Sequence, residues 1–159
     1  MANWKDDRLE SAVQGRNPTV LLRMKSGFAV IGDTQFLPGY CLLLAYPKVG
    51  SLNDLSLEQR ADFLLDMSLL GDAIHAVCKP LRVNYEILGN TDPFLHAHIS
   101  PRYAWEEESR RKSPVWLYPQ RNWALDEYQF RPEKHGDLKE RLTSALQDAM
   151  NATATIRSS

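Results

Sequence analysis

Two of the four histidines in the chain, His96 and His98, are separated by one residue and are the strongest candidates for chemistry. Side chains of a β-strand alternate between its two faces, so both imidazoles would point the same way. The alternate positions Leu95, Ala97 and Ile99 are all apolar. The pattern therefore predicts a strand that buries one face in a core and presents two imidazoles on the other.

A His-x-His strand is compatible with three roles. Neutral imidazole is a common metal ligand, and it is also a nucleophile suited to phosphoryl chemistry near neutral pH. In the third, the histidines have no chemical role and are simply two polar residues on a half-exposed strand. A metal site would need another nearby protein ligand, but the next positions on the same face are Phe94 and Ser100. We therefore expect neither a metal nor a cofactor, while the catalytic and the purely structural roles both stay open.

The residues around this strand are suited to phosphate. Gly89, Asn90 and Thr91 form a predicted turn whose backbone N–H groups, amide and hydroxyl match phosphate oxygens. Arg102 places a cation just beyond the strand. Asn84, on the preceding run, is a candidate support for the same site. These features favour the binding of a phosphate group beside the histidines.

The segment 84–103 contains Leu-His-Ala-His-Ile-Ser-Pro-Arg and resembles the signature strand of the histidine triad (HIT) superfamily of nucleotide hydrolases and transferases, in particular a bacterial branch of it. That signature has three histidines separated by single apolar residues, followed by two residues and Pro-Arg. The alignment puts His96 on the middle histidine, which is the family's nucleophile, and His98 on the last. Phe94 stands at the position of the first histidine, so the triad is incomplete.

The resemblance implies that His96 attacks the α-phosphorus of a nucleotide and that water hydrolyses the resulting nucleotidyl-histidine. His98 would donate to a phosphate oxygen, Asn90 and Thr91 would hold others, and no metal would take part. The implied ligand is a purine nucleotide or a nucleoside phosphate derivative, such as a dinucleoside polyphosphate or a nucleoside phosphoramidate. Since Phe94 cannot make a histidine's hydrogen bond, the alternative is a catalytically decayed nucleotide-binding or interaction protein on the same fold.

The first half of the chain extends the resemblance. The runs 20–24 and 28–31 predict a hairpin, and 40–45, after Pro-Gly, predicts an apolar central strand. In the family, a carboxylate or amide after the second strand binds the ribose hydroxyls, and a one-residue shift gives this role to Asp33. An Asx-turn is the alternative role of Asp33. Tyr40 stands where many members have a histidine.

The helices complete the expected architecture. A capping box at residues 56–59 opens a predicted helix over 57–78, and a strand over 81–88 leads antiparallel into the signature strand. Residues 137–152 predict a final helix. We expect an α+β, HIT-like fold: an antiparallel sheet of about five strands, one long helix between strands and a C-terminal helix.

The length of 159 residues predicts a single HIT-like domain over 1–159, with a core at about 20–103 and a C-terminal extension at 104–159. The segment 113–123 holds two of the four tryptophans. Such an aromatic segment either packs on the domain or a second subunit, or walls a base pocket.

The overall charge excludes some classes of partner. With 19 basic and 20 acidic residues, the net charge of −1 gives no case for nucleic acid or a membrane surface. Cys41 and Cys78 do not form a disulfide framework. The charged start, without an apolar signal region, and the lack of a long apolar run favour the cytoplasm. The resemblance further implies a homodimer.

Overall fold

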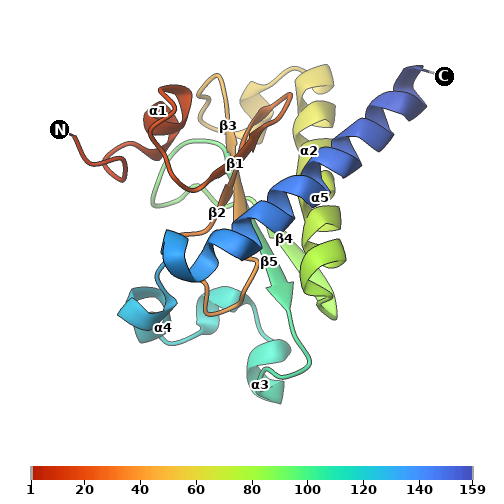
Figure 1. Cartoon of the computed structure of the whole chain (residues 1–159). Helices are drawn as coiled ribbons and strands as arrows, with labels where there is room; N and C mark the ends of the chain where they lie inside the picture. Colours follow the sequence, from red (N-terminus) through yellow and green to blue (C-terminus); the bar gives the residue numbers. More distant parts are fainter. Residues whose placement is uncertain (1, 159) are drawn as a thin grey trace.

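The computed structural model describes the backbone of residues 2–158 and the side chains of residues 2–156, so Met1 and Ser159, at the ends of the expected domain, lie outside it. Five strands form one antiparallel sheet in the order β1-β2-β3-β5-β4 (Figure 1). They are β1 Val20–Arg23, β2 Gly27–Ile31, β3 Cys41–Ala45, β4 Arg82–Glu86 and β5 His96–Arg102. The predicted α+β architecture is confirmed.

Two long helices, α2 and α5, lie side by side and cover one face of this sheet (Figure 1). Helix α2 packs on β3, β4 and β5, and α5 packs on β1 and on α2. The helices are α1 Arg8–Val13, α2 Leu57–Cys78, α3 Glu108–Arg111, α4 Gln120–Ala124 and α5 Pro132–Ser158. Short 3₁₀ turns lie at Leu52–Asp54, Val115–Leu117 and Asp126–Tyr128. None of the helices within residues 2–158 is both long and apolar enough to cross a membrane.

Local sequence sets both ends of α2. The Ser56 side chain accepts a hydrogen bond from the Gln59 N–H, and the Gln59 side chain accepts one from the Ser56 N–H. At the other end, Lys79 takes the left-handed conformation that closes helices, with φ of 49°. The helix therefore has the predicted bounds.

The main core lies between the sheet and these two helices. Strand β5 and the residue before it contribute an apolar face there, since Leu95, Ala97 and Ile99 are all buried. This confirms the predicted orientation of the signature strand. Its register fixes what surrounds the histidines on the opposite face: Leu42 of β3 pairs with His98, and Leu44 pairs with His96. Directly paired residues lie side by side on one face of a sheet.

The C-terminal extension contains a longer helix than the sequence predicts. Helix α5 begins five residues before the predicted 137 and continues beyond 152. Pro132 suits a first helical turn, and the residues before 137 are polar, so they carry no apolar period that would reveal a helix. Residues Val115, Tyr118, Trp123 and Tyr128 of the extension pack around Phe36 in the loop between β2 and β3.

Candidate active site

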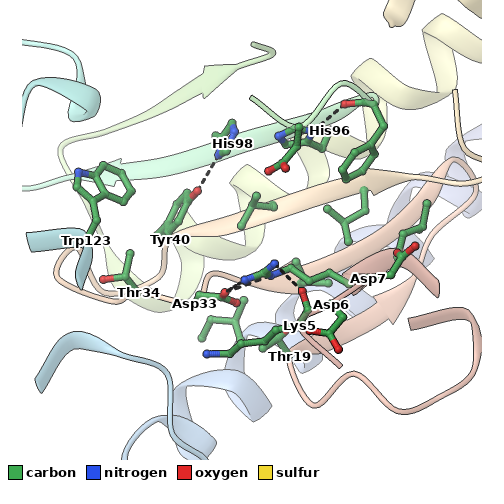
Figure 2. Close-up of a pocket in the computed structure, with 18 of the residues that line it drawn as sticks. Lys5, Asp6, Asp7, Thr19, Asp33, Thr34, Tyr40, His96, His98 and Trp123 are labelled. Carbon is green, nitrogen blue, oxygen red and sulfur yellow. Dashed lines mark hydrogen bonds and ion pairs between the residues drawn. The ribbon is translucent and has the colours of Figure 1, made fainter. Parts of the chain in front are cut away.

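A cavity of about 680 Å³ lies on the face of the sheet that α2 and α5 leave uncovered (Figure 2). Both histidines of β5 line it, together with Val30 of β2 and Leu42 and Leu44 of β3. The N-terminal segment and the C-terminal extension also contribute to its walls. The cavity therefore combines a polar row on β5 with an apolar floor on β2 and β3.

His96 is oriented by the protein backbone. Its Nδ1 lies 2.8 Å from the carbonyl oxygen of Phe94. A carbonyl oxygen only accepts hydrogen bonds, so Nδ1 carries a proton, and in the neutral ring Nε2 then holds the lone pair. Phe94 thus supplies through its main chain a bond that its side chain cannot make. The His96 side chain is buried, and its Nε2 has the electronic form that a nucleophile requires.

His98 is oriented by a side chain, that of Tyr40. The Tyr40 hydroxyl lies 2.7 Å from Nδ1 of His98 (Figure 2). Burial lowers the pKa of His98 to about 4, the neighbouring His96 adds to this shift, and Asp92 opposes it. Burial also raises the pKa of Tyr40, and the charge of Asp33 adds to that shift. At neutral pH the pair is therefore an uncharged imidazole and an uncharged phenol.

Two tryptophans of the extension wall the cavity next to His98. Trp116 and Trp123 stack with ring centroids 4.7 Å apart and planes 5° apart. Trp116 meets His98 edge to face, and Trp123 meets both Tyr40 and Phe36 edge to face. The Trp116 indole N–H donates to Glu86 of β4 at 2.8 Å. The segment 113–123 thus both packs on the domain and walls the cavity.

Asp33 lies in the cavity, as its predicted role requires, but it already has a partner. The Nε of Arg8 donates to Oδ2 of Asp33 at 3.1 Å, and the same two side chains form an ion pair. Arg8 comes from α1, and Lys5 and Asp7 of the same segment line the cavity too. The N-terminal segment therefore forms a wall of the cavity beside Asp33, the candidate ribose-binding carboxylate. Nothing in the sequence of this segment indicated that position.

Asn90 and Thr91 lie on the loop that enters β5, and both side chains are exposed. That loop reaches the cavity through its next three residues, Asp92, Pro93 and Phe94. The two candidate phosphate ligands therefore lie beside the cavity but do not line it.

Arg102 and Asn84 lie elsewhere. Arg102 is only 4% exposed, and its guanidinium donates to Glu106, to Oδ1 of Asn84 and to two backbone carbonyls. Hydrogen bonds from Arg102, Tyr103 and Tyr118 lower the pKa of Glu106 despite its burial. Neither Arg102 nor Asn84 lines the cavity. The Arg102 guanidinium instead joins the end of β5 to the extension.

The sequence indicated no role for several residues that line the cavity, among them Arg8, Lys48 and Tyr40. Lys48 Nζ lies 5.2 Å from the ring centroid of Phe94. The only sequence signal for Tyr40 was its place after Pro-Gly. Among the residues that the structure describes, no group of three His, Cys, Asp or Glu side chains could hold a metal ion.

Comparison with known proteins identifies the fold. No protein-family model and no curated protein matches the chain. Among solved structures, a histidine triad protein from Sinorhizobium meliloti superposes with a TM-score of 0.68 at 15% identity, over 84% of this chain and 93% of that one. A histidine triad protein from Bradyrhizobium japonicum gives 0.66 at 20% identity, over 80% and 89%. The diadenosine triphosphate hydrolase of Plasmodium falciparum gives 0.59 at 18%, over 82% and 77%. The chain therefore has the histidine triad fold, and identities this low establish the fold alone.

Proposed function

We propose that this protein is a nucleotide-binding hydrolase that cleaves nucleoside phosphate derivatives through a nucleotidyl-His96 intermediate. The observation that carries the proposal is the hydrogen bond of 2.8 Å between Nδ1 of His96 and the Phe94 carbonyl, since it leaves the Nε2 lone pair available inside the cavity. The fold supports it as well, because one structural neighbour is a diadenosine triphosphate hydrolase.

The reaction has two steps. In the first, the Nε2 lone pair of His96 forms a bond to the α-phosphorus, and the bond from phosphorus to the leaving group breaks, with its electron pair going to the leaving group. In the second, water attacks phosphorus and releases a proton to the solvent, and the electrons of the P–N bond return to Nε2. The nucleoside monophosphate leaves and His96 is restored. The Phe94 carbonyl stabilises the positive charge that the ring carries in between.

The other side chains bind and orient the nucleotide. His98 donates from Nε2 to a phosphate oxygen, and Asn90 and Thr91 close over the phosphates from the adjoining loop. The apolar floor of the cavity takes the purine base. Asp33 accepts from the ribose hydroxyls, which requires it to share or exchange its bonds to Arg8.

We also propose that the protein acts as a homodimer. Strand β4 is an edge of the sheet. Three large apolar side chains in and beside it are exposed: Leu81, Tyr85 and Leu88. Unpaired strand edges and exposed apolar side chains are the features through which two copies associate. Sedimentation analysis tests this point: the mass of two chains is expected, and replacing Tyr85 with Lys should give the mass of one.

Hydrolysis of a dinucleoside triphosphate and of a nucleoside phosphoramidate by the wild type and by His96→Ala tests the function. Loss of at least about 1,000-fold in His96→Ala is expected for removal of a nucleophile. The second candidate function is a nucleotide-binding protein that has lost catalysis, because Phe94 stands where the family's first histidine would be. No turnover in the wild type, together with tight nucleotide binding and activity gained in Phe94→His, would favour that candidate.

A further inference from the structure

Tyr40 is held more firmly than a residue that merely lines a cavity. Its side chain is buried, and its backbone carbonyl accepts from the Gly32 N–H at 2.8 Å and from Nε2 of Gln35 at 2.9 Å. The ring lies directly on Gly32, because a Cβ atom at that position would be 2.3 Å from Cδ1 of Tyr40. Trp123 packs edge-on against the same ring. The hydroxyl is therefore fixed where it meets His98.

The direction of this hydrogen bond follows from its surroundings. Among the described residues, Nδ1 of His98 is the one hydrogen-bonding partner of the Tyr40 hydroxyl. A phenol has one proton to donate, and a buried donor without an acceptor is costly. The hydroxyl therefore donates to Nδ1. His98 then keeps its remaining proton on Nε2, which is the tautomer that can donate to a phosphate oxygen.

The surroundings of His98 offer no replacement acid. The groups that face it are His96, Asp92, Trp116 and, across the β4–β5 pair, Glu86. Glu86 accepts the Trp116 indole N–H, and His96 provides the nucleophilic lone pair. Ionised carboxylates only accept hydrogen bonds. Lys48 lies over the ring of Phe94, at the other end of the row from His98.

We infer that Tyr40 is a positioning residue that holds His98 as a neutral hydrogen-bond donor, and that it thereby selects substrates whose leaving group departs as an anion. The inference rests on the proposed function. A nucleotide or other phosphate leaves with the electron pair of the broken P–O bond and needs only a hydrogen bond from Nε2 of His98. An amine must gain a proton as the P–N bond breaks. If His98 gave its Nε2 proton to the amine, Tyr40 would have to pass its hydroxyl proton to Nδ1 of His98. Tyr40 would then be a phenolate, and burial opposes that charged form.

Two substrates with the same nucleoside test the selectivity. The p-nitrophenyl ester of adenosine 5′-phosphate releases an anion, and an N-alkyl phosphoramidate of the same nucleotide releases an amine. We expect wild-type kcat/KM to be at least about 100-fold lower for the amine, the contribution that a missing general acid makes. Tyr40→His places a group that can carry a proton beside His98, so it should raise the amine-to-ester ratio at least about tenfold. Tyr46→Phe removes a hydroxyl at a residue that does not line the cavity, and should leave the ratio unchanged.

Nitrogen-detected NMR of the histidine rings tests the positioning role without turnover. The wild type should show His98 protonated at Nε2 alone at neutral pH, and Tyr40→Phe should convert it to a mixture of tautomers. Equal rates on the two substrates, an unchanged ratio in Tyr40→His, or a His98 ring protonated at Nδ1 would each overturn the inference. Failure of the wild type to turn over either substrate, with the tautomer as stated, would instead overturn the proposed function and the selectivity with it.

Discussion

Phe94 orients His96 through its backbone carbonyl and not through a polar side chain. The Phe94 carbonyl oxygen accepts a hydrogen bond from Nδ1 of His96, with 2.8 Å between the two atoms. Any residue at position 94 would provide that carbonyl. The aromatic ring of Phe94 packs against the imidazole at 4.7 Å and adds contact area. The orientation of His96 therefore depends on the path of the chain at residue 94, and little on which side chain stands there.

Phe94→Leu should consequently keep turnover within about tenfold of the wild type, because leucine retains the carbonyl and much of the packing volume. Steady-state hydrolysis of a dinucleoside triphosphate measures this effect. A loss beyond about 100-fold would mean that the ring itself takes part in the reaction.

His98 should make stability depend on pH. Its pKa is lowered from the ordinary 6.5 to about 4 in the folded protein, so the unfolded chain binds the proton more tightly. Its contribution is fully present above pH 6.5, is lost as the pH falls toward 4, and amounts to about 3 kcal/mol at most. Urea unfolding of the wild type and of His98→Gln from pH 7 to pH 4 measures it. Stability curves that stay parallel over this range would show that His98 titrates normally.

At the scale of elements, the end of β5 is joined to the extension by a buried ion pair. The Arg102 and Glu106 side chains are 4% and 0% exposed, and Glu106 also accepts from the Tyr103 N–H and the Tyr118 hydroxyl. Because that extension carries Trp116 and Trp123, this network also positions the aromatic wall of the cavity.

Glu106→Ala should lower the free energy of unfolding by about 3–5 kcal/mol, since it leaves a buried guanidinium without its counter-charge. Glu108→Ala is the matched control, because the Glu108–Lys112 pair is exposed and its loss should cost less than about 1 kcal/mol. Chemical denaturation of both variants decides the point. Equal losses of unfolding free energy in the two variants would mean that burial adds nothing to the stabilisation by the Arg102–Glu106 pair.

Elements with local signals could be predicted from the sequence, and contacts between distant segments could not. The capping box and the apolar period gave α2 its correct bounds, and period-two alternation gave the buried face of β5. No local pattern could indicate that Arg8 meets Asp33, or that Tyr40 meets His98, since these pairs are 25 and 58 residues apart. The sequence indicated a free cation beyond the strand at Arg102, but Arg102 is the last residue of β5, and the path of the extension explains why its donors are used internally.

In the whole molecule, the main core and the cavity lie on opposite faces of the sheet. Helices α2 and α5 pack on one face of the sheet (Figure 1) and form the main core with it, while the cavity lies on the other face. Changes in the core should therefore affect folding without altering the arrangement of the two histidines.

Leu146→Ala tests this separation. Leu146 of α5 is fully buried in the main core, so its truncation should cost about 2–5 kcal/mol of stability while kcat/KM below the unfolding temperature stays near the wild-type value. Leu57→Ala, at a side chain that is 77% exposed, should change neither quantity. A fall in kcat/KM of the folded Leu146→Ala protein would show that the core and the cavity are coupled.

A covalent bond between His96 and the nucleotide should be visible by intact-mass analysis after brief mixing with a dinucleoside triphosphate. We expect a species heavier by one nucleotidyl group, located by peptide mapping at His96, that is absent in His96→Ala and present in Phe94→Leu. Turnover that persists in His96→Ala, with no adduct on the wild-type chain, would contradict it.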